Sequence, residues 1–147
     1  MQKIARDAFI LLNAAAIFLI AACQSAAPTQ IINSRPNGVI LKDGAWAPNA
    51  EIVAALETRL PAYLAQQQTK FSARHAPIVE RLAQYKFQYW GEMKNGKRVV
   101  AVNAFCAAFD DWKTQRVFVL DGGDCFFNLQ YDVDSGTFFD LQVNGEA

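Results

Sequence analysis

The chain is 147 residues long, which is enough for one domain with a substantial core and too short for two. It carries 14 basic and 14 acidic side chains, so its formal net charge is zero. Binding to nucleic acid needs clustered basic charge, and we therefore expect no nucleic-acid partner. The 11 Phe, 4 Tyr and 3 Trp favour a sheet-rich fold, because aromatic side chains suit half-buried pleated surfaces.

The N-terminal segment has the pattern of a secretory signal. Lys3 and Arg6 precede the apolar run 8–22, which is shorter than the roughly 20 apolar residues that span a membrane. A charged start, an apolar middle and small residues before a cleavage site are typical of secretory signals. The run ends in Ile-Ala-Ala-Cys at 20–23, and residues 1–24 resemble the lipobox signal of bacterial lipoproteins.

This resemblance implies a location. In that family the Cys is diacylated, the signal is cut before it, and the new amine is usually acylated too. It thus implies a signal peptide at 1–22 and a lipidated (palmitate-bearing) Cys23 that anchors the protein to a membrane outside the cytoplasm. In that family Asp after the Cys favours the inner membrane, so Gln24 implies the outer membrane, with the domain facing the periplasm.

Residues 23–37 are predicted to form the lipidated Cys and a flexible tether, because small polar residues and two prolines bury too little apolar surface to fold. Residues 38–147 are predicted to form a single α+β domain. At its start, Val39–Leu41 could be a short strand or a loose arm.

Two helical patterns follow. An apolar stripe recurs every four residues at Ile52, Leu56, Leu60 and Leu64. Asn49 suits the start of this helix, while Pro61 either kinks it or begins a second one. A shorter pattern after Pro77 predicts another helix over about 77–84.

After Tyr85 the apolar period changes to two, which indicates strands. Asn95-Gly96 predicts a two-residue type I′ hairpin turn, which would place Tyr89 opposite Val102. A third strand is predicted over 115–121, turning at Gly122-Gly123 so that Val119 lies opposite Phe126. Further strands are predicted near 125–131 and 139–143, on either side of a turn at 134–136.

The predicted fold is therefore α+β, with N-terminal helices packed on a four- to five-stranded antiparallel sheet. The order of elements across 48–145 resembles, in outline, the cystatin-like and NTF2-like rolls. The stretches 103–106 and 121–125, together with Trp112 and the ending 143–147, resemble bacterial lipoproteins that have no assigned activity. This second resemblance implies no catalytic function.

Cysteine usage fits an oxidising compartment. With Cys23 bearing lipid, Cys106 and Cys125 remain as one pair with a single possible connectivity. A disulfide between them would stabilise the domain by roughly 3 kcal/mol. A redox or metal role would need further Cys or His partners, so we expect a structural disulfide, no metal and no cofactor.

Two motifs could carry chemistry but have simpler interpretations. His75 is the only histidine and lies in a polar loop without a nucleophile motif, so we interpret it as an ordinary loop residue. Asp132-x-Asp134-x-Gly136 resembles the start of a calcium loop, but the twelfth position is Val143 rather than an acid. We therefore expect a hairpin turn there.

Four aspartates could converge through the predicted disulfide: Asp110, Asp111, Asp121 and Asp124. Paired carboxylates can divide acid and base roles, which gives the alternative of a small envelope hydrolase with paired aspartates in a concave sheet pocket. Turns and strand ends also attract Asp simply for solvation and local hydrogen bonds. We prefer this second interpretation and assign no catalytic residue.

The best functional candidate is the loop that holds Phe109, Asp110, Asp111 and Trp112. Aromatic side chains on a loop fixed by a disulfide suit a binding surface. Alternatively, Phe109 and Trp112 fold inward and cap the sheet. The sequence thus favours a non-enzymatic, membrane-anchored binding module for an envelope protein or a small ligand.

Replacing Cys23 with Ser removes the predicted site of lipidation. We expect the variant to leave the membrane fraction, because acyl chains contribute ~0.8 kcal/mol per buried methylene and several chains anchor a protein stably. Cell fractionation measures this, with Ser25→Ala as the control. Unchanged membrane association of the Cys23→Ser protein would contradict the assignment.

Overall fold

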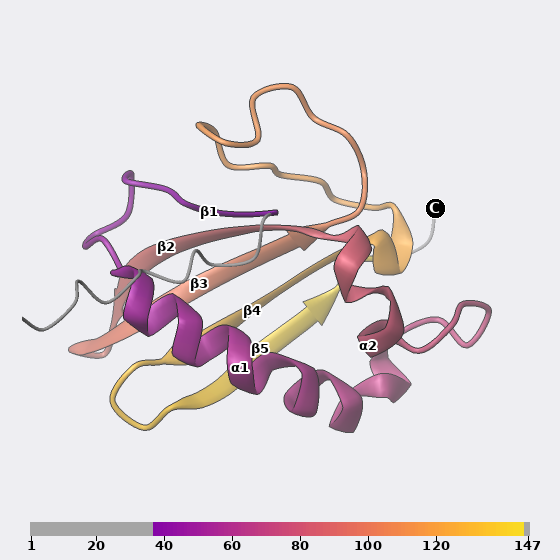
Figure 1. The fold of residues 1–147 in the computed structure, drawn as a ribbon, viewed down its shortest axis with the longest axis horizontal. Coiled ribbons are helices and arrows are strands. Elements are labelled where there is room, and N and C mark those ends of the chain that lie inside the picture. Colours follow the sequence, from indigo (N-terminus) through magenta and orange to yellow (C-terminus); the bar gives the residue numbers. More distant parts are fainter. Residues whose placement is uncertain (1–36, 146–147) are drawn as a thin grey trace, which may run out of the picture.

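The computed structural model describes residues 37–145 as an α+β fold with two α-helices and a five-stranded sheet (Figure 1). The elements are β1 (Gly38–Ile40), α1 (Ala50–Gln66), α2 (Ile78–Arg81), β2 (Lys86–Lys94), β3 (Lys97–Phe105), β4 (Phe126–Asp132) and β5 (Thr137–Val143). The predicted signal peptide, Cys23 and most of the tether lie outside the described residues. Within 37–145, no helix is both long and apolar enough to cross a membrane.

The strands lie in the order β1-β2-β3-β4-β5, and the sheet is open. Strands β2 to β5 are antiparallel, whereas β1 runs parallel to β2, so the sheet is mixed and the expectation of a purely antiparallel sheet is wrong. The difference has a topological cause. The chain passes through both helices between β1 and β2, and such a crossover can join parallel strands, while tight hairpins join antiparallel ones.

The predicted hairpin between β2 and β3 is confirmed. Asn95 and Gly96 have φ angles of 51° and 76°, as a type I′ turn requires. The register that follows from this turn is also as predicted, with Tyr89 opposite Val102.

Helix α1 runs across one face of the sheet (Figure 1). Asn49 caps it, since its side-chain oxygen accepts a hydrogen bond from the Ile52 amide at 2.9 Å. Pro61 lies inside one continuous helix, so a second helix does not begin there. The predicted helix over 77–84 is present as α2 followed by a 3₁₀ turn at Leu82–Gln84.

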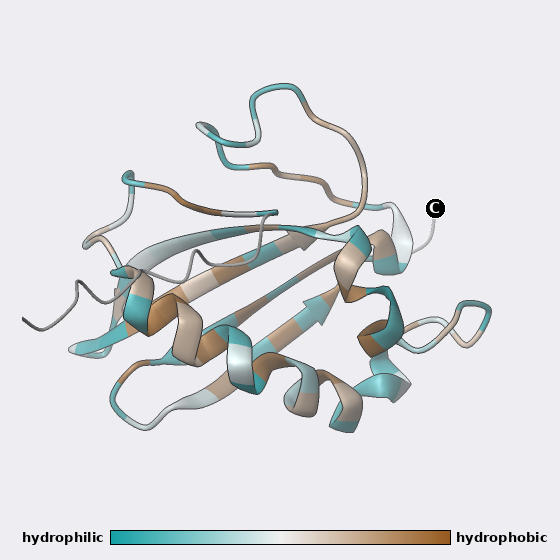
Figure 2. Cartoon of the chain, viewed as in Figure 1, coloured by the Kyte–Doolittle hydropathy of each residue, from teal (hydrophilic) through white to brown (hydrophobic). Residues whose placement is uncertain are grey.

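The main core contains the buried stripe of α1 and the strand residues that face it. Its largest members include Leu56, Leu60, Leu64, Tyr85, Phe87, Tyr89, Phe127 and Leu129. Figure 2 shows hydrophobic residues along β3, the central strand. Because side chains alternate along a strand, the residues between these core positions point to the opposite face of the sheet.

The predicted strand over 115–121 is not formed, and this expectation is wrong. Phe126 pairs with Phe105 of β3 rather than with Val119. The segment instead belongs to a long loop between β3 and β4, where Phe118 and Leu120 are exposed. Side chains, rather than a neighbouring strand, form hydrogen bonds to one edge of its backbone, as described below.

Replacing Gly96 with Val tests the hairpin turn. No other group lies near a Cβ built at this position, so the cost arises from the positive φ alone. We expect the free energy of unfolding to fall by about 1–2 kcal/mol, the usual cost of a left-handed conformation. Gly145→Val is the control, because that site is equally open but has no positive φ. Equal thermal midpoints for the two variants would contradict the explanation.

Candidate functional site

The loop 106–125 joins β3 to β4 and is closed by a disulfide. Cys106 and Cys125 are bonded, with their Cα atoms 5.1 Å apart, which confirms the predicted pairing. The Cys106 amide also donates to the Cys125 carbonyl at 3.0 Å. Figure 1 shows the loop extending well beyond the strands, on the side of the sheet edge formed by β1. Both ends of the loop are thus fixed at one point.

The middle of the loop is held by Gln88, a fully buried residue of β2. Its side-chain oxygen accepts from the Val117 amide at 2.9 Å, and its side-chain nitrogen donates to the Gln115 carbonyl at 2.6 Å and to the Trp112 carbonyl. Gln88 lies between Phe87 and Tyr89, whose side chains point into the main core, so the Gln88 side chain points to the opposite face of the sheet. The loop that it binds therefore contacts the face opposite α1.

Two further amide side chains complete this attachment. Asn103 of β3 donates to the Val117 carbonyl at 2.8 Å, and Asn144 donates to the Val119 carbonyl at 2.7 Å. We call Gln88, Asn103 and Asn144 the amide clamp. It supplies the bonds that a neighbouring strand would make, which explains why 115–121 forms no regular strand.

Phe109 and Trp112 are half-buried and pack on the sheet. Phe109 lies edge-on to Phe105 and Phe126, with ring centroids 5.5 and 6.2 Å apart, and Trp112 lies 6.0 Å from Phe105. These contacts agree with the alternative in which Phe109 and Trp112 fold inward and cap the sheet. Asp110 and Asp111 are exposed beside them.

The loop encloses a surface hollow of about 350 Å³, lined by Phe109, Asp110, Asp111, Trp112, Gln115, Arg116, Val117 and Phe118. All four residues predicted to form a binding loop therefore line a common hollow. Sequence reasoning missed Phe118 and Leu120, which are 83% and 82% exposed. The sequence does not indicate that these two residues are exposed, because Val117–Leu120 is a continuous apolar run typical of a buried strand.

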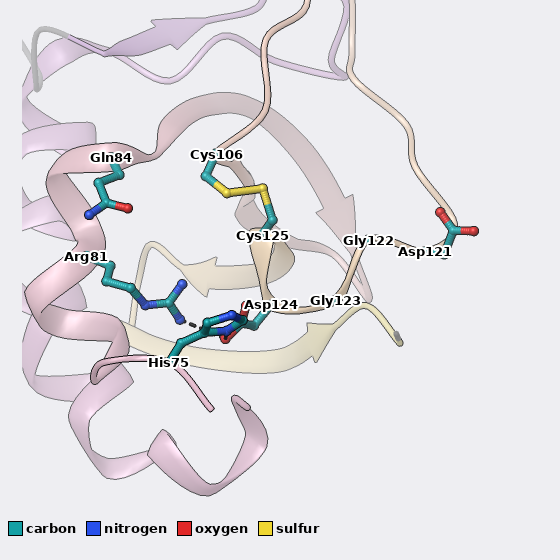
Figure 3. A pocket seen from close by; sticks show the side chains of 9 residues that line it. All are labelled: His75, Arg81, Gln84, Cys106, Asp121, Gly122, Gly123, Asp124 and Cys125. Carbon is teal, nitrogen blue, oxygen red and sulfur yellow. Dashed lines mark hydrogen bonds and ion pairs between the residues drawn. A yellow bond between two sulfur atoms is a disulfide. The ribbon is translucent and has the colours of Figure 1, made fainter. Parts of the chain in front are cut away.

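A second hollow, of about 550 Å³, lies where the disulfide meets α2 (Figure 3). At its edge, the buried Asp124 carboxylate lies 2.7 Å from Arg81 Nη2 and 3.0 Å from His75 Nδ1. Tyr85 donates its hydroxyl hydrogen to the Asp124 carbonyl. Burial raises the pKa of Tyr85 to about 12, so this donor keeps its proton at neutral pH.

The four aspartates do not gather at one point. Asp121 and Asp124 line the second hollow, whereas Asp110 and Asp111 line the first. Figure 3 shows the Asp121 carboxylate directed away from Asp124, which faces Arg81 and His75. The sequence did not indicate that Asp124 pairs with His75 and Arg81, because this contact depends on how α2 lies against the loop.

The predicted turn at 134–136 is present between β4 and β5. One oxygen of Asp132 accepts hydrogen bonds from the amides of Asp134 and Ser135, at 2.9 and 3.0 Å. The bond from Ser135 is the main cause that holds the pKa of Asp132 below its ordinary value. Across 37–145, no group of three His, Cys, Asp or Glu residues could hold a metal ion.

No family model, curated protein or solved structure matches this chain. The features that could carry a function are the two hollows and the loop 106–125. Of these, the loop combines a fixed backbone with exposed apolar side chains, and we take it as the candidate site.

Replacing Gln88 with Leu tests the amide clamp. The variant leaves the Val117 amide and two loop carbonyls without their partner, and each such buried group costs about 1–3 kcal/mol. Taking three such groups at the lower end of this range, we expect a loss of about 3 kcal/mol in unfolding free energy. Hydrogen exchange at Val117 should also accelerate, although the disulfide remains.

Gln142→Leu is the matched control, since Gln142 is an exposed glutamine of β5. It should leave both the stability and the exchange at Val117 close to those of the parent protein. If the two glutamine variants behaved alike, Gln88 would not be what holds the loop.

Proposed function

We propose that this chain is a lipoprotein anchored through Cys23 in the outer membrane, and that its domain binds an envelope protein on the periplasmic side without catalysing a reaction. One observation carries the binding proposal. Phe118 and Leu120 are exposed on a loop that a disulfide and the amide clamp hold in place.

Leaving these two apolar side chains in water is unfavourable. Burying a Phe or Leu side chain contributes about 1.5–3 kcal/mol, and two such residues on one segment provide a favourable contact for a partner. The fixed loop loses little conformational entropy when it binds. Large apolar side chains that stay exposed on a rigid segment are typical of interaction sites.

The location and the shape belong to the same proposal. The lipobox resemblance at 1–24 supports the anchor, and the disulfide is compatible with an oxidising compartment. The order of elements, a helix followed by the antiparallel strands β2 to β5, supports a cystatin-like or NTF2-like roll.

A small hydrolase is the second candidate, favoured by the contact between His75 and Asp124. A carboxylate that binds one ring nitrogen can orient the other as a general base. Among the described residues that line this hollow there is no Ser or Thr, so water would be the nucleophile. Arg81 shares the same carboxylate oxygen, which favours a structural role for Asp124 instead.

Site-specific crosslinking in the native host tests the binding proposal. A photoreactive residue at position 118 of the full-length protein should yield a discrete adduct with another envelope protein. The control is position 93, because Met93 is also apolar and exposed, at 53%, but lies on the β2–β3 hairpin. No adduct at 118, or the same adducts at both positions, would contradict the proposal.

Changing Phe118 and Leu120 together to Ser supplies the complementary evidence. We expect the stability to change by less than about 0.5 kcal/mol, because both side chains are exposed. Crosslinking from a photoreactive residue at the neighbouring position 121 should nevertheless be lost, while Met93→Ser should leave it intact. Retention of the adduct in the double variant would show that these two side chains do not bind the partner.

A further inference from the structure

The backbone of 116–120 has one satisfied edge and one open edge. On the satisfied edge, the amide clamp bonds the Val117 amide, the Val117 carbonyl and the Val119 carbonyl. In an extended chain, successive residues direct their backbone groups to opposite sides. By this alternation the backbone groups of Phe118, and of Leu120 at the bend that follows, belong to the other edge. Within 37–145 these groups form no hydrogen bond.

The burial of the side chains agrees with an extended segment. Val117 and Val119 are half-buried, while Phe118 and Leu120 are exposed, so burial alternates with a period of two. An open strand edge with free N–H and C=O groups is a template for pairing with another extended chain. Proteins use this mode of recognition to bind peptides by adding a strand.

The charges beside this edge indicate what the added strand carries. Asp110 and Asp111 lie in the hollow that Phe118 helps to line, and Asp121 follows Leu120 in the chain. None of these three carboxylates forms an ion pair with a residue of the described part of the chain. The exposed edge therefore lies beside three carboxylates that take part in no ion pair of the described residues.

The nearby positive charges are engaged with other groups. Lys86 Nζ and Lys113 Nζ each lie 5.7 Å from the centre of the Trp112 ring. Arg116 Nε lies 2.9 Å from an Asp43 carboxylate oxygen, and its guanidinium lies 4.3 Å from the centre of the Trp90 ring. It is therefore not available to neutralise the aspartates of the loop. The aspartates of the loop therefore attract a cationic partner and repel an acidic one.

We infer that the open edge of 116–120 binds an extended segment of an envelope protein in which basic residues alternate with apolar ones. This inference rests on the proposed function and names the partner's chemistry. The partner's backbone pairs with Phe118 and Leu120, its apolar side chains contact theirs, and its Lys or Arg side chains pair with the aspartates.

A peptide library tests the inference on the full-length lipidated protein in detergent. The probe is a set of ten-residue peptides in which Lys or Arg alternates with Val, Ile, Leu or Phe. The comparison set has Glu in place of every basic residue. We expect capture of the basic set to exceed that of the acidic set at least tenfold, and to weaken at high salt, since salt screens exposed charges.

Two measurements distinguish strand addition from contact by side chains alone. Hydrogen exchange at the Phe118 and Leu120 amides should slow at least tenfold when a captured peptide is added. Leu120→Pro removes an outward N–H, so it should reduce capture at least tenfold relative to Leu120→Ala, which removes only the side chain.

The outcomes separate this inference from the proposed function. An adduct at position 118 without preference for basic peptides, or without slowed exchange, overturns strand addition and leaves the binding function in place. Hydrogen exchange at the Phe118 and Leu120 amides could instead slow as the protein concentration rises, without any peptide. That result assigns the edge to a second copy of this chain and overturns the peptide partner. Absence of both adduct and peptide capture overturns both proposals.

Discussion

The second face of the sheet depends on one buried side chain, Gln88. Its amide lies in the middle of β2, where an apolar residue would ordinarily cover the sheet, and it must find hydrogen-bond partners because a buried amide left unpaired is costly. It finds them in the backbone of a loop that lies more than twenty residues away in the sequence. The buried Gln88 amide and the backbone groups of the loop therefore satisfy each other's need for hydrogen bonds.

The disulfide and the amide clamp constrain different parts of the same loop. The bond between Cys106 and Cys125 fixes its ends, while Gln88 and its partners hold 112–119 against the sheet. Phe109 and Trp112 fill the space between with apolar contacts to Phe105. A long loop is thus ordered although its only helix or strand is the 3₁₀ turn Gly123–Cys125, and long loops of this kind commonly have a function.

The two faces of the sheet consequently have different roles. The face beneath α1 carries the apolar core of buried side chains, which contributes stability. The face beneath the loop combines a polar attachment with exposed apolar side chains. The contact of His75 and Arg81 with Asp124 joins α2 to the end of this loop, so we regard it first as a structural link between the two layers.

The sequence by itself determined the parts that depend on neighbours in the chain: the helix start at Asn49, the turn at Asn95-Gly96, the register of β2 and β3, and the pairing of two cysteines. These follow from local geometry or from the lack of alternatives. Only the tertiary structure decided that 115–121 is no regular strand and that Phe118 and Leu120 face solvent, because this depends on distant amides at Gln88, Asn103 and Asn144. A run of Val, Phe and Leu has the same local preference whether a strand or a set of side chains satisfies its backbone, so the site could not be read from the chain alone.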